Sequence, residues 1–249
     1  TAIVTADTAA ALNTALTNAT STDALTLTVN GATAQATDLI DLDGKTSVDV
    51  SVTATAVSGT FANLNTVYVT NVANYVNLGD ENVTITDTTS ASNVNIILGA
   101  TSGNVTAIVT ADTAAALNTA LTNATTGTDA LTLTINDTSL TSVSDLLALD
   151  GKTNVAVNAS SVNSISETIA NLNTAYNSAG ISGLGNENIS ITNTGTITAA
   201  QVNDLLGETS GTITLVGSGN LAITMTSGQT LDLSGITNSL SGNLTIEDS

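Results

Sequence analysis

Carboxylates make up nearly all of the ionisable side chains with which this chain could perform chemistry. Aspartate and glutamate number 21 in 249 residues, lysine and arginine together number 2, and histidine, cysteine, tryptophan and proline are absent. Such a chain has no imidazole base, no thiolate nucleophile, no disulfide and no thiolate or imidazole metal ligand. Paired carboxylates can cleave glycosidic bonds, but the basic and aromatic side chains that usually accompany them are nearly all missing. We therefore expect no enzymatic activity, no catalytic residue and no cofactor-binding residue.

Oxygen ligation of a hard cation such as calcium is the metal chemistry that this composition permits. Candidate ligands are Asp41 and Asp43, in the sequence Asp-Leu-Asp-Gly, and the adjacent pair Asp80 and Glu81. A second copy of the first motif has Ala148 in place of Asp41, and a complete calcium loop needs further oxygen ligands at fixed spacing. The alternative interpretation of each motif is a turn or a helix cap. We expect no resident cofactor, with calcium as the metal to test at these four residues.

The charge balance indicates which partners the chain avoids. The formal net charge is −19, which repels the phosphate backbone of nucleic acids. No apolar run approaches the length of about 18 residues that would span a bilayer. We therefore expect neither nucleic-acid binding nor membrane insertion.

Both lysines follow a glycine, at Gly44-Lys45 and Gly151-Lys152. The two sequences resemble the end of a phosphate-binding loop, but leucine stands where that loop needs its first glycine. A glycine that ends a helix, followed by a lysine near the negative end of the helix dipole, explains both copies.

The chain contains a long internal duplication. Residues 1–20 recur without a change at residues 106–125, and further matches follow downstream in the same order. The duplication predicts a first super-repeat over residues 1–105, a second over 106–211, and a shorter-period segment over 212–249. The sequence has the character of a piece of a longer repetitive protein.

Alternating segments predict strands at intervals that are mostly 23 to 25 residues, with one longer interval of about 34 residues in each half. In residues 131–135, leucine and isoleucine share one face of the strand and threonines share the other. Between strands the period becomes helical, as in residues 112–121, where Asp112 can cap the helix and Leu117 and Leu121 form a stripe. Expected strands are Ala2–Ala6, Leu25–Asn30, Val48–Val52, Val83–Thr86, Thr106–Thr110, Leu131–Asn136, Val155–Ala159, Ile189–Thr192 and Thr212–Leu215.

We use the word rung for one repeating segment of strand, turn, short helix and turn. A rung cannot bury its own apolar face, but stacked rungs with parallel strands form a continuous core. The expected fold is an α/β repeat: a right-handed β-α solenoid, similar to a parallel β-helix, with one strand and one short helix per rung of about 24 residues. After residue 215 the helical period disappears, and strands are expected at Leu221–Thr226, Leu231–Leu233 and Leu244–Ile246, which predicts an all-β continuation or cap.

Several phrases resemble the repeats of giant threonine-, alanine- and asparagine-rich proteins that bacteria, notably marine cyanobacteria, secrete or carry on the cell surface. They are Leu-Asp-Gly-Lys-Thr at residues 42–46 and 149–153, Thr-Ser-Gly-Asn-Val-Thr at residues 101–106, and the glycine-rich sequence at residues 175–187. The resemblance spans both super-repeats and implies an extracellular or cell-surface location. It carries no catalytic residue.

These observations predict a structural role. We expect the chain to form part of an extracellular filament, surface layer or adhesin stalk, with copies of itself as the partner. The alternative is an adhesive module that binds calcium or a surface glycan through the connections at residues 68–82 and 176–188.

Overall fold

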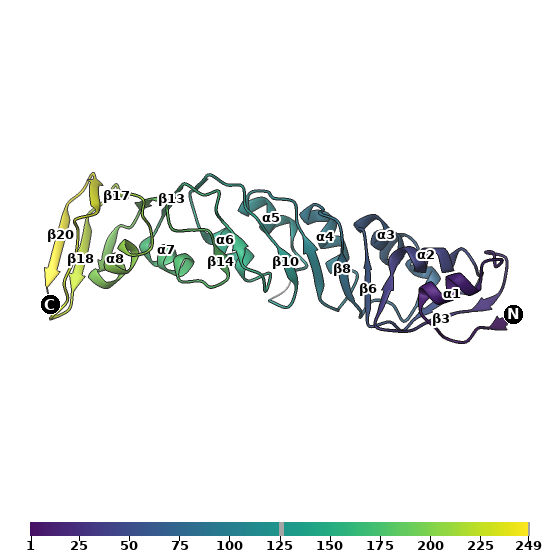
Figure 1. Ribbon diagram of the computed structural model, residues 1–249. Coiled ribbons are helices and arrows are strands. Elements are labelled where there is room, and N and C mark those ends of the chain that lie inside the picture. The colour runs from purple at the N-terminus through teal and green to yellow at the C-terminus, as the bar shows by residue number, and fades with distance from the viewer. Residues whose placement is uncertain (125–126, 249) are drawn as a thin grey trace. The chain divides into compact units, whose positions relative to one another are not determined.

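The computed structural model describes residues 1–124 and 127–248, so Thr125, the last residue of the second copy of the duplication, lies outside it. The chain has an α/β fold in which strands and helices alternate and the sheets are parallel (Figure 1). It divides into two compact units. Unit 1 comprises Thr1–Thr110, Thr119–Leu133 and Lys152–Val155, and unit 2 comprises Ala111–Asn118, Thr134–Gly151 and Ala156–Ser249.

The helices are short. They are α1 (Ala9–Ala15), α2 (Ala36–Asp43), α3 (Phe61–Asn65), the π-helical turn η1 (Thr66–Thr70), the 3₁₀ turn η2 (Val72–Asn74), α4 (Ala91–Leu98), α5 (Ala114–Ala120), α6 (Ser144–Asp150), α7 (Ile169–Tyr176) and α8 (Ala199–Leu206). Helices of seven or eight residues are not stable alone in water, so their stability comes from packing. Consecutive helices pack against each other within a unit, as α1 does on α2 and α7 on α8.

The strands of unit 1 form three sheets. Their orders are β1-β2, β3-β5-β7 and β10-β9-β8-β6-β4. The strands are β1 (Ala2–Ile3), β2 (Leu25–Thr26), β3 (Thr28–Val29), β4 (Thr33–Gln35), β5 (Val50–Val52), β6 (Ala56–Gly59), β7 (Tyr75–Val76), β8 (Asn82–Ile85), β9 (Val105–Ile108) and β10 (Ala130–Thr132).

The strands of unit 2 form three more sheets, with orders β11-β13-β15-β17-β19, β12-β14 and β16-β18-β20. The strands are β11 (Ser139–Leu140), β12 (Val157–Asn158), β13 (Ser164–Glu167), β14 (Ile181–Ser182), β15 (Asn188–Ile191), β16 (Gly195–Thr198), β17 (Ile213–Gly217), β18 (Leu221–Met225), β19 (Ile236–Leu240) and β20 (Leu244–Asp248). The paired arrows β18 and β20 lie side by side at the yellow end of the chain (Figure 1).

The pairing pattern is uniform across both units. Every pair of strands is parallel, and paired residues are between 22 and 26 positions apart in the sequence. The expected long interval of about 34 residues is wrong, because two further strands lie inside it in each half, β6 and β7 in unit 1 and β13 and β14 in unit 2. Val50 pairs with Tyr75, and Val157 pairs with Ile181. Many rungs also carry a second strand directly before the helix, so one strand per rung was too few.

Alternation places the core as the sequence predicts. In β8, Val83 and Ile85 are buried while Asn82 and Thr84 are exposed, which is the period of two that a strand requires. In α4, the buried residues Val94, Ile97 and Leu98 lie on the side of the helix that faces the core, and Ser90 caps the helix through its side chain. The buried core is made almost wholly of alanine, valine, leucine and isoleucine.

Side chains from one rung also cap the helices of the rung before it. In α3, α5 and α7, the first backbone N–H of the helix donates to a side-chain oxygen more than twenty residues later. These bonds join Phe61 N to Asp87 Oδ1, Ala114 N to Asp137 Oδ2 and Ile169 N to Asn193 Oδ1, each at 2.7 Å. Each bond satisfies an N–H that the helix itself leaves unpaired, and it fixes the spacing of adjacent rungs.

The two lysines act at the other helix ends. Gly44 and Gly151 do end α2 and α6, as expected. The lysines, however, reach the preceding rung: Lys45 Nζ donates to Leu16 O at 3.1 Å, and Lys152 Nζ donates to Leu121 O at 2.8 Å. These carbonyls lie at the C-terminal ends of α1 and α5, where a positive charge is favourable.

The C-terminal segment contains strands and no helix among the described residues from 213 onward. The strand expected at Leu231–Leu233 is wrong, and β19 begins at Ile236 instead. Asp232 turns the chain at that point, because its carboxylate accepts from Ser234 N at 2.8 Å while its own N–H donates to Asn203 Oδ1 at 3.1 Å. Such a local side-chain bond competes with a strand ladder.

Candidate functional site

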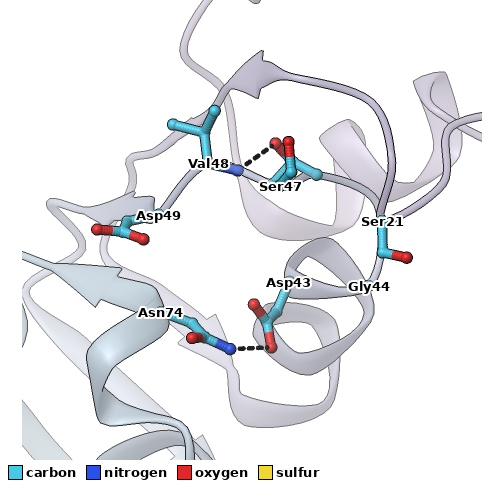
Figure 2. A pocket seen from close by; sticks show the side chains of 8 residues that line it. Ser21, Asp43, Gly44, Ser47, Val48, Asp49 and Asn74 are labelled. Carbon is cyan, nitrogen blue, oxygen red and sulfur yellow. Dashed lines mark hydrogen bonds between the residues drawn. The ribbon is translucent and has the colours of Figure 1, made fainter.

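The first pair of candidate ligands lies on one helix but does not converge. Asp41 and Asp43 both belong to α2, two positions apart, so they point in different directions. Asp41 is exposed, whereas Asp43 is partly buried and lines a polar pocket of about 360 Å³ (Figure 2). Asp43 Oδ2 accepts from Asn74 Nδ2 at 3.0 Å and from Asn71 Nδ2 at 3.4 Å. This carboxylate therefore ties α2 to the next rung and already has two donors.

Figure 2 shows the hydrogen bond between the Asn74 amide and the Asp43 carboxylate, both of which line this pocket. Asp49 lines the same pocket, as do hydroxyl groups from the connection after α2. The pocket therefore presents two carboxylates and several hydroxyl and amide groups on a single surface of unit 1. The remaining lining residues are Ser21, Gly44, Thr46, Ser47 and Val48.

The second pair of candidate ligands lines a single pocket. Asp80 and Glu81 lie directly before β8 and line one pocket of about 340 Å³ in unit 1, together with Asn77, Thr53 and Thr55. Asp80 is exposed, while Glu81 is 2% exposed. Among the described residues there is no group of three or more acidic, histidine or cysteine side chains that could hold a metal ion. Only the Asp80 carboxylate is exposed, so a cation in this pocket would need amide, hydroxyl or carbonyl oxygens for most of its shell.

A buried tyrosine holds Glu81 in place. Tyr68 Oη donates to Glu81 Oε2 at 3.1 Å, and Gly79 N donates to the same oxygen at 2.9 Å. The other carboxylate oxygen, Oε1, is buried and has no hydrogen-bond partner among the described residues. Burial and the adjacent carboxylate raise the pKa of Tyr68 well above its usual value, so the phenol stays protonated as the donor.

The same arrangement recurs in unit 2. Glu187 is fully buried, and its Oε2 accepts from Tyr176 Oη at 2.7 Å and from Gly185 N at 2.8 Å. Burial, followed by the hydrogen bond to Glu187, raises the pKa of Tyr176 above its usual value. The carbonyl of each buried glutamate is also bound by a threonine hydroxyl of the next rung, Thr101 in unit 1 and Thr209 in unit 2, at 2.7 and 2.8 Å.

We call these two arrangements the tyrosine–glutamate contacts. The sequence analysis did not pair these tyrosines with Glu81 and Glu187. The signal was present: in both halves a tyrosine precedes a Gly-x-Glu-Asn sequence by about ten residues. The threonine bonds to the carbonyls of Glu81 and Glu187 join each contact to the next rung, which gives the contacts a structural role in each unit.

The strand edges form a different kind of candidate site. In the order of the described sheets, β1, β19 and β20 are among the strands that pair on one side only. The unpaired backbone groups of an edge strand can pair with a further strand. Ile246 on β20 is 52% exposed, whereas Ile223, its partner on β18, is fully buried. The isoleucine side chain is therefore buried on β18 and exposed to solvent on β20.

Comparison of the chain with models of protein families, with curated proteins and with solved structures found no match. Among the described residues, no helix is long and apolar enough to cross a bilayer.

Proposed function

We propose that the chain is a structural repeat module that forms part of an extracellular filament, surface layer or adhesin stalk and assembles with copies of itself. The observation that supports this function is the uniform ladder: every described strand pair is parallel and joins residues 22 to 26 positions apart. A right-handed β-α solenoid is the fold that best accounts for this regularity. Its function would be to provide length and a repeating surface.

Cross-rung side-chain bonds support the structural role, because they fix the spacing of rungs independently of the sheets. The carbonyls of the buried glutamates, the capping carboxylates and the lysines each connect one rung to another. In a solenoid, stability is approximately a sum over the rungs and the interfaces between neighbouring rungs. Further rungs can therefore be added to such a module with the same contacts.

The acidic surface supports an assembly that responds to ions. With a net charge of −19, copies of the chain repel each other at low ionic strength. Screening over a Debye length of about 8 Å at physiological salt removes much of that repulsion. The resemblance of the repeats to bacterial surface proteins is what favours assembly outside the cell.

Electron microscopy of the purified chain tests this function. At concentrations of tens of micromolar and physiological salt, we expect fibres or sheets, and at low salt we expect mostly dispersed protein. Light scattering during a salt titration measures the same transition in solution. Monodisperse monomers at every salt and calcium concentration would contradict the proposal.

A second candidate function is an adhesive module that binds calcium or a surface glycan. It is favoured by the pocket that brings Asp80 and Glu81 together and by the polar pocket around Asp43. Calorimetric titration with calcium, with and without Asp80→Asn, tests the metal. Saturable binding that Asp80→Asn weakens and that raises the melting temperature would favour this candidate. Titration of Asp41→Asn serves as a matched control, because Asp41 is exposed and lines neither pocket.

A further inference from the structure

Three aspartate or asparagine residues are followed directly by glycine, in the pairs Asn30-Gly31, Asp43-Gly44 and Asp150-Gly151. In such a pair the backbone nitrogen of the glycine can attack the side-chain carbonyl carbon of the preceding residue and close a five-membered ring. Glycine favours this reaction because it has no Cβ to hinder ring closure and adopts many backbone conformations. The reaction also needs a free glycine N–H and a side chain without fixed partners, so the hydrogen bonds of each pair decide whether it reacts.

The two aspartate–glycine pairs are held by hydrogen bonds. They end the helices α2 and α6, and the glycine N–H of each donates to a carbonyl of its helix, at 3.2 Å and 3.3 Å. Both carboxylates have partners too, because Asp43 Oδ2 accepts from Asn74 Nδ2 and Asp150 Oδ2 accepts from Ser178 Oγ. Ring closure would have to break these bonds, so neither pair is poised to react.

The asparagine–glycine pair has no such contacts. It lies in the turn between β3 and β4, where both residues are exposed. In the described part of the chain, neither the side-chain amide of Asn30 nor the backbone N–H of Gly31 has a hydrogen-bond partner. Gly31 has a φ of +103°, and a Cβ at this position would meet only Thr8 Cγ2 within 4 Å, at 3.4 Å. The nucleophile and the amide are therefore both free, and the turn has room to rotate.

The equivalent turn of the second half has the same backbone contact but a different second residue. Asn30 N donates to Asp7 O, and the equivalent Asn136 N donates to Asp112 O, each at 3.0 Å. Asn136 is exposed like Asn30, but it is followed by Asp137, whose carboxylate caps α5. A side chain at this position hinders ring closure, so the duplication contains a matched turn that should not react.

We propose that the Asn30 side chain loses its amide nitrogen spontaneously, which makes this turn a modification site of the chain. Gly31 N forms a bond to Asn30 Cγ, the bond from Cγ to the side-chain nitrogen breaks, and ammonia leaves with the proton from Gly31 N. Water then opens the ring at either of its carbonyl carbons. One product is aspartate with the normal backbone, and the other is isoaspartate, in which the backbone runs through the side-chain carbons. Each product adds a negative charge, and nothing is oxidised or reduced.

The two products differ in what they do to the contacts between rungs. Isoaspartate adds a carbon atom to the backbone directly after Val29, which is fully buried and whose carbonyl accepts from Thr53 N of the next rung at 2.8 Å. Residue 30 itself donates to Asp7 O of the rung before. We therefore expect isoaspartate to loosen contacts on both sides of this rung, whereas aspartate leaves the backbone unchanged.

Peptide mapping of protein stored at neutral and at mildly alkaline pH tests the reaction. Trypsin cleaves only after Lys45 and Lys152, so Asn30 lies in one peptide with Asn13 and Asn18, which are followed by threonine and alanine. Fragmentation in a mass spectrometer measures the amide lost at each position. We expect Asn30 to convert about tenfold faster or more than the other two, because only glycine leaves ring closure unhindered. Conversion should be faster at alkaline pH, since the attacking nitrogen must lose its proton.

The second half of the chain supplies the control. Gly31→Asp gives the first turn the sequence of the second, and conversion at residue 30 should then fall to that of Asn136. The native chain gives the same comparison without a variant, because both asparagines are measured in one sample. Equal conversion of Asn30 and Asn136 in the folded native chain would overturn the proposal, and so would an undiminished rate in Gly31→Asp. This modification is independent of the proposed assembly, which neither result would touch.

The variant Asn30→Asp separates the added charge from the change in backbone. It carries the charge of the products without isoaspartate, so its melting temperature should equal that of the fresh native chain. Stored native protein should melt at a lower temperature in proportion to its isoaspartate content, which chromatography of the peptides measures. An unchanged melting temperature in protein rich in isoaspartate would contradict the expected loss of contacts between rungs.

Discussion

The two tyrosine–glutamate contacts reach the same side-chain geometry through different backbones. Tyr68 and Glu81 are 13 residues apart in unit 1, while Tyr176 and Glu187 are 11 apart in unit 2. In unit 1, the helix continues past α3 into the π-helical turn η1, and Tyr68 lies in that turn. In unit 2, Tyr176 is the last residue of the regular helix α7. A wider helical turn therefore absorbs additional residues while the phenol keeps its contact with the carboxylate.

The carboxylates differ in how fully they are satisfied. Gly185 N lies within hydrogen-bond distance of both oxygens of Glu187, at 3.1 and 2.8 Å. Glu81 instead has one oxygen with two donors and one buried oxygen with none among the described residues. A buried acceptor without a donor costs free energy. The regular helix of unit 2 thus supports a better-satisfied contact than the π-helical turn of unit 1.

The largest predicted effect comes from the glycines that contact the buried glutamates. A Cβ at Gly103 would overlap the carbonyl of Glu81 and lie 2.8 Å from Asn82 N. A Cβ at Gly211 would overlap the carbonyl of Glu187 in the same way. Because backbone cannot move aside cheaply, Gly103→Ala and Gly211→Ala should each lower the free energy of unfolding by about 3 kcal/mol. Urea unfolding followed by circular dichroism measures the loss.

Two other glycines serve as controls for these variants. Gly44 and Gly207 end α2 and α8 in the right-handed helical conformation, with no atom closer than 3.4 Å to a Cβ. Alanine at either position should leave stability within about 0.5 kcal/mol of the parent chain. Equal losses at all four glycines would contradict the view that the buried glutamates set a fixed distance between rungs.

Replacing the buried glutamates by glutamine should lower stability by different amounts in the two units. In Glu187→Gln, one of two oxygens that face Gly185 N becomes an NH₂ group, so a donor would face a donor. We expect a loss of about 2 kcal/mol for this variant. In Glu81→Gln, the NH₂ group can occupy the place of the oxygen without a donor, and we expect a loss of about 1 kcal/mol. A larger loss for Glu81→Gln in urea unfolding would reverse the comparison.

High pH should destabilise unit 1 more than unit 2. Burial raises the pKa of Tyr68 and Tyr75 in unit 1 and of Tyr176 in unit 2. The unfolded chain releases these protons near pH 10 whereas the folded chain keeps them, so stability is complete below about pH 10 and falls above it. Each tyrosine contributes about 1.4 kcal/mol per pH unit in that range. Unfolding at several pH values above 10 measures the slope.

Phenylalanine variants assign this slope to each unit. The double variant Tyr68→Phe, Tyr75→Phe should remove about twice as much of the alkaline slope as Tyr176→Phe removes. An unchanged slope in all variants would show that these tyrosines do not cause the alkaline loss. Tyrosinate absorbance, recorded during the same titrations, reports the ionisation directly.

Local patterns in the sequence predicted the class of fold and most of the strands. The period of two in residues 131–135 and the helical stripe of residues 112–121 are short-range signals. The expected alternation of burial is present in residues 131–135, but the strand β10 ends at Thr132 and residues 134 and 135 form only isolated bridges. The helix forms as expected, except that Thr113 Oγ1, not Asp112, accepts the helix N–H of Ala116. The short strand β7 was missed, because Tyr75 and Val76 follow two irregular helical turns and carry no alternation of their own. Only the pairing of Tyr75 with Val50 defines that strand, and a contact across 25 positions leaves no local trace.

The candidate ligands show the same limit. Sequence proximity grouped Asp41 with Asp43, but a helix turns residues two positions apart in different directions, and only Asp43 lines a pocket. Asp80 and Glu81 do line one pocket, although Glu81 is committed to Tyr68. The hydrogen bond from Tyr68 to Glu81 depends on the π-helical turn η1, which composition and spacing did not indicate.

The smallest predicted effect distinguishes the two tyrosines of unit 1. The hydroxyl of Tyr75 is buried without a hydrogen-bond partner among the described residues, whereas that of Tyr68 donates to Glu81. Tyr75→Phe should therefore raise the free energy of unfolding by about 0.5 kcal/mol, because it removes a polar group whose burial is uncompensated. Tyr68→Phe should lower it by about 1.5 kcal/mol, because Glu81 loses a donor while remaining buried. A loss of stability in Tyr75→Phe at neutral pH would mean that this hydroxyl is satisfied in solution, and the contrast between the two tyrosines would then disappear.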